Sequence, residues 1–348
     1  ILIDLSNKED FYLNSLNIFY SDESSISTKF FAIQVLKNAI QKKWVCMRPS
    51  FQDEVRSFVC SYFFENPFHK ETPIDGLVFQ LVFSILFYEW PEKWSNFFTD
   101  LIDIENSEIT TILALKFMAF IGYETQSNLL TSVRTYIISH SLESKIPAIF
   151  QFIQTLLTKN EISKEIVIAS FKFLTSCIPW ISADLFVEST FFSQLAENYF
   201  ENTELTEVII PFLTELVTSL DLPPDKQGII SQIFNILTSI NGKVSNPFHF
   251  VSAIKAIYDF YSQVVEVRDN IGQYKETLDF ILRITSEADD FENPELLEIC
   301  LSFWAKIFQR CTTDNSPITS NLYILDVTNG FKLTDTIEIQ DGNIRYLS

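Results

Sequence analysis

Amphipathic helical segments recur along this chain at nearly regular intervals. Apolar residues follow the 3.6-residue helical period from end to end. Grouped in pairs, these helices begin near residues 8, 50, 92, 125, 161, 202, 246 and 290, so successive pairs start 33 to 44 residues apart. Helix pairs of roughly 40–47 residues are typical of HEAT or armadillo repeats. Because one pair cannot bury its apolar face alone, neighbouring pairs stack on it. The sequence therefore predicts an all-α fold, an α-solenoid of about eight HEAT helix pairs.

The predicted helices are 9–20, 27–44, 50–66, 73–90, 92–104, 107–122, 125–141, 143–158, 163–178, 183–200, 203–219, 224–240, 247–264, 268–288 and 294–311. The composition agrees with this pattern, because the 348 residues include only 7 Gly but 34 Phe. So little glycine argues against glycine-rich phosphate loops and against a fold of strands and tight turns.

Helix 27–44 is apolar over more than half of its circumference, with Ser27 or Thr28 as the expected N-cap. The remaining narrow stripe has i, i+3, i+4, i+7 spacing. It consists of Gln34, Lys37, Asn38 and Gln41. A helix of this kind packs on several sides and presents one polar stripe. Two interpretations of that stripe remain open. In the first it has a structural role, as a solvated face or as a ladder of hydrogen bonds between repeats. In the second it contacts a partner.

The end of the chain has a different pattern. Residues 314–348 contain one Pro and two Gly, and residues 336–346 alternate around an Asp-Gly turn. This alternation predicts a short β-hairpin-like segment. The last helix pair then has no clear second helix, and the chain begins at Ile1 rather than Met. We therefore expect a fragment of a longer protein.

The net charge of −20 argues against a broad nucleic-acid-binding face, which needs clustered Lys and Arg. An acidic surface either keeps an apolar chain soluble or suits a basic partner. No apolar run reaches the roughly 18 residues of a membrane-spanning helix, and no secretory signal is visible. The five Cys lack CxxC spacing and are interpreted as thiols in a reducing compartment.

The sequence gives little support for catalysis. His69, His140 and His249 are far apart and lack metal-ligand spacing. Nucleophile-elbow and phosphate-loop motifs are absent. We predict no enzyme activity, no catalytic residue, no metal and no cofactor.

Tryptophans mark three local clusters. Trp90 and Trp94 flank Pro91, Trp180 follows Pro179, and Trp304 lies in an apolar helix. Large rings beside a proline-forced break fix the angle between two helices. We interpret these tryptophans, and Trp44 with them, as structural residues.

Several of these segments resemble one known family. Residues 28–44 are similar to the first repeat of the importin-β superfamily of nuclear transport receptors. Residues 89–98, EWPEKWSNFF, resemble the E-W-P-x-x-W-P-x-F-I segment of its export receptors, with Ser95 replacing the second proline. Residues 173–186 resemble their W-I-P-x-x-x-I-F stretch, with Cys177 in place of that tryptophan. Residues 297–304 are similar to their I-C-L-x-Y-W helix, and residues 341–345 to the hairpin that follows it.

The resemblance implies a nuclear export receptor, an exportin or karyopherin. Such a protein binds the GTPase Ran in its GTP form, takes leucine-rich export-signal cargo cooperatively, contacts nucleoporins, and shuttles between nucleus and cytoplasm through the nuclear pore. The positions that match the Ran-binding face are Gln34, Lys37, Asn38 and Gln41. The cargo groove of the family falls outside these residues.

The resemblance also predicts a division of the chain. Residues 1–122 are expected to form importin-β-like repeats 1–3 with the Ran-binding part, residues 123–311 exportin-like repeats 4–8, and residues 312–348 an irregular or hairpin insertion. Two alternatives remain open: another karyopherin, either an importin or a different exportin, and a HEAT-repeat scaffold that does not bind Ran.

Overall fold

In a computed structural model, the chain is built from helices that form two compact units, Ile1–Leu185 and Phe186–Ser348. The structure describes residues 11–64, 72–102, 107–126, 132–159, 161–187, 190–200, 202–219, 222, 227–240, 244, 246–265, 271–288, 293–313, 337–340 and 343–346. Both units are stacks of helices of the HEAT type, so the predicted fold class is confirmed.

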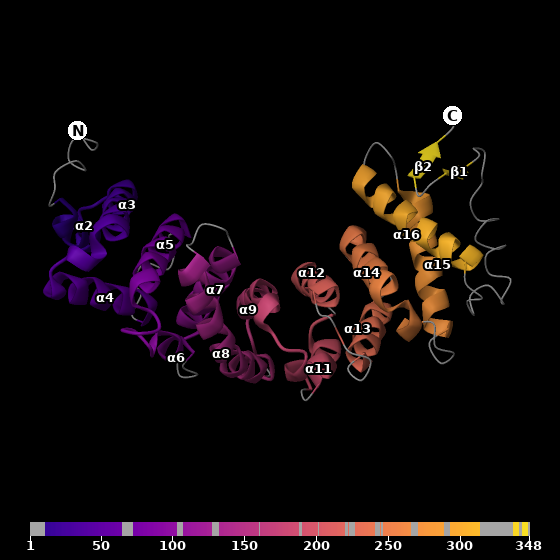
Figure 1. Cartoon of the computed structure of the whole chain (residues 1–348), viewed down its shortest axis with the longest axis horizontal. Coiled ribbons are helices and arrows are strands. Elements are labelled where there is room, and N and C mark those ends of the chain that lie inside the picture. The colour runs from indigo at the N-terminus through magenta and orange to yellow at the C-terminus, as the bar shows by residue number, and fades with distance from the viewer. Residues whose placement is uncertain are drawn as a thin grey trace. The chain divides into compact units, whose positions relative to one another are not determined.

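The first unit contains α-helices and short 3₁₀ helices (η). They are η1 (Phe11–Asn14), α2 (Ser15–Tyr20), α3 (Ile26–Lys43), η2 (Trp44–Cys46), α4 (Pro49–Phe64), α5 (Thr72–Glu89), α6 (Phe97–Leu101), α7 (Glu108–Gln126), α8 (Ser132–Leu157), α9 (Lys164–Cys177) and η3 (Ile178–Trp180). Helices α3, α5, α7 and α9 pack successively against one another in one row, while α4, α6 and α8 lie in a second row (Figure 1).

The short helix α10 (Asp184–Val187) lies at the boundary of the units. The second unit contains α11 (Phe191–Asn198), α12 (Thr203–Ser219), α13 (Gly228–Ser239), α14 (Pro247–Val265), α15 (Ile271–Glu287) and α16 (Pro294–Thr313). Within it, α14 packs against both α12 and α16, and α13 packs against α11 and α15. The same two-row arrangement is thus present in each unit.

Aromatic rings form much of the core in both units. In the first, Phe63 of α4, Phe79 of α5 and Phe117 of α7 are buried, with ring centroids 5.1–6.1 Å apart. In the second, Phe191 lies 6.2 Å from Phe212 of α12. Such rings bury large apolar areas and add edge or stacking contacts, which explains how a chain this rich in Phe folds into thin helical layers.

Helix α3 begins earlier than the sequence suggests. The expected N-cap was Ser27 or Thr28, but Ser25 has extended backbone angles and its Oγ accepts a hydrogen bond from the Thr28 N–H at 3.2 Å. The sequence offers four Ser or Thr residues within five positions here, Ser24, Ser25, Ser27 and Thr28, and each is a good cap. The expected N-cap was therefore wrong, and Ile26 is the first helical residue.

The middle of the chain differs more from expectation. The two helices predicted at 125–141 and 143–158 are one helix, α8, which contains Pro147. Leu142 and Ile146 are both buried, so core packing continues through the predicted break. Taken in chain order without α10, the described helices group as α2–α3, α4–α5, α6–α7, α8–α9, α11–α12, α13–α14 and α15–α16, seven successive groups of two where the sequence suggested about eight.

At the end of the chain, β1 (Ile337–Gln340) pairs antiparallel with β2 (Asn343–Tyr346), with Ile337 opposite Tyr346. The turn of the predicted hairpin, residues 341–342, lies outside the described residues. The hairpin as a whole therefore stays a prediction.

Candidate functional site

The polar stripe of α3 is at the surface of the first unit. We call Gln34, Lys37, Asn38 and Gln41 the α3 strip. Asn38 and Gln41 are exposed, whereas Gln34 and Lys37 are half-buried. The opposite face of the helix is fully buried and includes Ala32, Ile33, Val35, Leu36 and Ile40. The period-3.6 pattern thus separates a core face from an accessible face on one helix.

The α3 strip is hydrogen-bonded to the next helix of its row. Lys37 Nζ donates to Gln80 Oε1 of α5 at 2.9 Å, and Gln41 Nε2 donates to Ser84 Oγ at 3.3 Å. Tyr88 OH donates to the main-chain oxygen of Gln41 at 2.9 Å. These contacts join two successive repeats. An inter-repeat ladder, one of the two interpretations left open by the sequence, is therefore present.

The rest of the strip remains accessible to a partner. Gln34 Nε2 donates to Asn38 Oδ1 at 3.1 Å, an exposed i,i+4 contact of a kind that contributes only about 0.2–0.5 kcal/mol. Asn38 is exposed and its amide nitrogen can donate outward. Burial lowers the pKa of Lys37 below its ordinary value, because desolvation disfavours the charged ammonium.

A groove of about 460 Å³ opens beside the strip, between α3, α5 and α7. Its lining combines half-buried aromatic rings, amides and one carboxylate. The lining residues are Gln41, Gln80, Phe83, Ser84, Phe87, Tyr88, Phe120 and Glu124. We call this the aromatic groove. It shares Gln41 with the α3 strip, so the two features form one continuous surface.

The sequence analysis missed the α5 side of this surface, because residues 77–88 look like a buried apolar run. Within that run, Gln80 and Ser84 are the polar interruptions, and their i, i+4 spacing places them on one helical face. Phe120 and Glu124 have the same spacing on α7. This spacing is the signal that could have located the groove.

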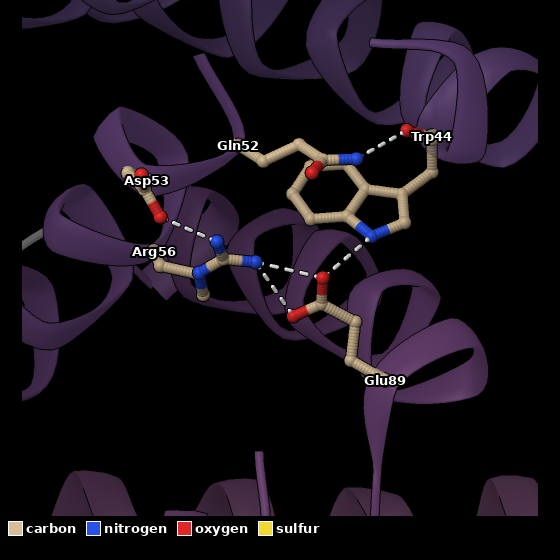
Figure 2. A network of polar contacts seen from close by, with 5 residues as sticks. All are labelled: Trp44, Gln52, Asp53, Arg56 and Glu89. Atoms are coloured by element: carbon tan, nitrogen blue, oxygen red, sulfur yellow. Dashed lines mark hydrogen bonds and ion pairs between the residues drawn. The ribbon is translucent and has the colours of Figure 1, made fainter. Parts of the chain in front are cut away.

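A buried ion pair joins α4 to the end of α5. The side chain of Glu89, at the end of α5, is only 2% exposed. Arg56 Nη1 of α4 donates to both of its oxygens, at 2.7 and 2.9 Å, and Trp44 Nε1 donates to Oε1 at 3.1 Å (Figure 2). Arg56 also donates to Asp53 at 2.5 Å, while Gln52 Nε2 donates to the Trp44 carbonyl at 2.6 Å. The network ties three successive helices together.

Burial alone would lower the pKa of Arg56, but its hydrogen bonds to Asp53 and Glu89 and their negative charges raise the pKa overall. The guanidinium therefore stays charged, as the buried carboxylate requires.

Arg134 of α8 makes a second polar link. Its guanidinium donates to the carbonyl oxygens of Phe87 at 2.5 Å, Leu86 at 3.2 Å and Trp90, and to the carboxylate of Glu92 at 3.2 Å. The last carbonyls of a helix have no partner within it, so a cation there satisfies them. Arg134 thereby completes the C-terminal end of α5.

Of the five tryptophans singled out from the sequence, four lie at helix ends or between helices, and Trp304 lies inside α16. Trp44, Trp90 and Trp304 are 1–3% exposed, while Trp94 and Trp180 are half-buried. Trp94 contacts Phe97 edge-on, with ring centroids 4.7 Å apart. Two of them donate buried hydrogen bonds: Trp44 Nε1 to Glu89 Oε1 at 3.1 Å and Trp304 Nε1 to Thr285 Oγ1 at 3.0 Å.

Potential metal ligands do not gather in the part of the chain that the structure describes. There, no group of three or more His, Cys, Asp or Glu residues could hold a metal ion. His140 lies 3.4 Å from Glu143 and His249 lies 4.0 Å from Glu207, while His69 is outside the described residues. Among the described helices, none is both long and apolar enough to cross a membrane.

Two family models match the chain, and together they cover the strip and the groove. The model of the importin-beta N-terminal domain matches residues 1–65, which contain α3. The model of exportin 1-like proteins matches residues 78–213, which contain most of α5 and all of α7. The chain is thus similar to importin-beta N-terminal domains over residues 1–65 and to exportin 1-like proteins over residues 78–213.

The relatives that the chain matches include exportins. Exportin-1 of Schizosaccharomyces pombe is 18% identical over 308 residues, covering 80% of this chain and 28% of the relative. Exportin 1A of Arabidopsis thaliana is 23% identical, covering 62% of this chain and 21% of the relative, and exportin 1B is 22% identical, covering 87% and 30%. The chain is thus similar to exportin-1 proteins and spans less than a third of their length.

A solved structure of Kap95p with RanGDP overlaps 88% of this chain and 47% of its own, with 14% identity and a TM-score of 0.35. A TM-score of 0.35 indicates only a loose likeness between the two folds.

Proposed function

We propose that this chain is the N-terminal part of a nuclear export receptor and that it binds Ran-GTP through the α3 strip. The observation that carries the proposal is the position of the strip. It is an accessible polar face on the helix that lies within the importin-beta N-terminal match. On this proposal, residues 1–122 contain the Ran-binding part, residues 123–311 continue the exportin-like repeats, and residues 312–348 are an insertion.

The rest of the transport cycle belongs to the longer protein. Leucine-rich export cargo would bind in later repeats, nucleoporins would be contacted during passage through the nuclear pore, and the receptor would shuttle between nucleus and cytoplasm. Binding of Ran-GTP and cargo would be coupled, and such coupling is typically 1–3 kcal/mol and reciprocal. A transport receptor acts by these equilibria and needs no catalytic residue.

Calorimetric titration of the chain with Ran loaded with GTP and with GDP tests the proposal at physiological salt. We expect selective binding of the GTP form, weakened by Gln34→Ala and by Asn38→Ala. Because both side chains are at the surface, either change should alter the unfolding free energy by about 0.5 kcal/mol or less. Gln151→Ala, an exposed amide on α8, is the matched control and should bind normally.

A Ran-independent HEAT scaffold is the second candidate, and the hydrogen bonds from Lys37 and Gln41 to α5 favour it. On that view the strip only joins two repeats. If Ran-GTP and Ran-GDP give equal titration curves, both with this chain and with the longer receptor, the Ran-binding proposal is wrong and the scaffold is the remaining candidate. A large stability loss in Asn38→Ala would also refute the strip as a docking face.

A further inference from the structure

We propose that the ammonium of Lys37 binds a carboxylate, the side chain of an Asp or Glu residue of the protein that docks on the α3 strip. This inference rests on the proposed function, because it names the chemical group that the partner brings to the same surface.

Helix α3 is basic although the chain as a whole is acidic. It contains four Lys and no Asp or Glu, whereas the net charge of the chain is −20. Lys42 and Lys43 are in its last turn, where a cation interacts favourably with the helix dipole. Lys29 is buried, and its Nζ lies 5.9 Å from the ring centroid of Phe19. Lys37 is in the middle of the helix on the accessible face, so neither role explains it.

The charge of Lys37 has no counter-charge in the structure. Among the described residues, its ammonium donates to the neutral amide oxygen of Gln80 at 2.9 Å and forms no ion pair. An ammonium has three N–H donors, so two are left for another acceptor. Partial burial lowers the pKa of Lys37, and no carboxylate raises it. The cation is therefore partly removed from water without an opposite charge beside it.

Docking on the α3 strip would remove more water from this ammonium. Covering a cation without a counter-charge is unfavourable, whereas a carboxylate supplies the opposite charge and accepts a charge-assisted hydrogen bond. A carbonyl oxygen of the partner would accept the hydrogen bond but leave the charge uncompensated. The other strip residues, Gln34, Asn38 and Gln41, are neutral amides, so no charge on the strip repels an acidic side chain. A carboxylate is therefore the partner group that suits this position.

Removing the cation tests the inference. Lys37→Met keeps most of the apolar stem and removes the charge. We expect calorimetric titration to show Ran-GTP binding about tenfold weaker than with the unaltered chain, and less dependent on salt, because a charge pair in the interface is lost. Lys93→Met, a change of an exposed lysine between α5 and α6, is the matched control and should bind as the unaltered chain does.

A second variant separates the charge from the contact between repeats, because Lys37→Met also removes the hydrogen bond to Gln80. Gln80→Leu removes that hydrogen bond and keeps the cation. We expect it to bind Ran-GTP about as tightly as the unaltered chain does. If Gln80→Leu weakens binding as much as Lys37→Met, the bond between repeats explains the effect and the inference is wrong.

A double-mutant cycle identifies the partner group. Each exposed Asp and Glu of Ran is changed to Asn or Gln in turn. One of these changes should weaken binding to the unaltered chain about tenfold and have little further effect on binding to Lys37→Met. If every change has the same effect on both chains, Lys37 does not contact a carboxylate and the inference is wrong.

These outcomes separate the two proposals. If Asn38→Ala weakens binding and Lys37→Met does not, the Ran-binding proposal stands and the carboxylate inference is wrong. If Ran-GTP binds neither this chain nor the longer receptor, the functional proposal is wrong and the carboxylate inference is wrong with it.

Discussion

The buried ion pair between Arg56 and Glu89 leads to the prediction that a variant lacking both charges is more stable than a variant lacking only the Arg56 charge. Arg56→Met keeps the apolar stem of the side chain but removes the cation. The Glu89 carboxylate, 2% exposed, then retains the Trp44 N–H as its hydrogen-bond donor. Breaking a buried pair in this way costs about 3–5 kcal/mol. Two charge-assisted hydrogen bonds are lost, at about 1.5–3 kcal/mol each, and their sum of about 3–6 kcal/mol overlaps that range.

Adding Glu89→Leu to Arg56→Met should restore part of the stability. The double variant no longer buries a carboxylate, and its main defect is the Trp44 N–H without an acceptor, at about 1–3 kcal/mol. We therefore expect it to be about 2 kcal/mol more stable than Arg56→Met. Asp53→Asn is the matched control. It removes the other carboxylate paired with Arg56, but Asp53 is 68% exposed, so we expect a loss of at most about 1 kcal/mol.

Native-state hydrogen exchange measured by mass spectrometry suits this comparison, because stacked repeats can unfold in parts. Peptides from α4 should exchange about a hundredfold to several thousandfold faster in Arg56→Met than in the unaltered chain, since each ~1.4 kcal/mol is a factor of ten. The double variant should exchange more slowly than Arg56→Met. Equal or faster exchange in the double variant would refute the buried-charge argument.

Two further predictions concern helix packing and the thiols. A Cβ on Gly122 of α7 would collide with Ser176 Oγ of α9, so Gly122→Ala should lower the unfolding free energy by about 1–3 kcal/mol. A Cβ on Gly76 would have nothing within 4 Å, so Gly76→Ala should raise the unfolding free energy by up to about 1 kcal/mol. Urea unfolding of both variants measures these changes, and equal effects of the two substitutions would contradict the prediction. Burial raises the pKa of the Cys177 thiol from 9.0 to about 12, so its contribution to stability is complete below pH 9 and is lost as the pH rises towards 12. In the folded protein iodoacetamide should therefore modify the exposed Cys46 and spare Cys177, and the reverse order would show that Cys177 is accessible.

Much of the helix pattern could be predicted from the sequence, because apolar period and capping residues are local signals. The helix predicted at 163–178 is α9, and Ser163 caps it by accepting from the Ile166 N–H at 3.4 Å. The helix predicted at 247–264 is α14 (Pro247–Val265). The continuous helix α8 could not be predicted in this way. A proline inside a helix removes a hydrogen bond locally, and only packing of buried neighbours such as Leu142 and Ile146 keeps the helix intact.

The part of the candidate site that lies on α3 could be predicted from the sequence, but its contacts with neighbouring helices could not. The α3 strip follows from spacing alone. Its hydrogen bonds to Gln80 and Ser84 join residues 43 positions apart, and the Arg56–Glu89 pair joins residues 33 apart. Such contacts depend on how one repeat is rotated and shifted against the next, which is decided by packing of the cores. The strip therefore remains a predicted docking face whose partner contact is a proposal.

Arg134 has a mechanical consequence. It belongs to α8, yet it is bonded to main-chain oxygens in the last turn of α5 and to Glu92 just beyond it. Stacked helices change their curvature by small sliding movements at their contacts. A planar guanidinium with several directed bonds resists sliding of α8 along the end of α5, because a shift of even one ångström would break several bonds at once. Bending within the first unit must therefore take place at helix contacts other than this one.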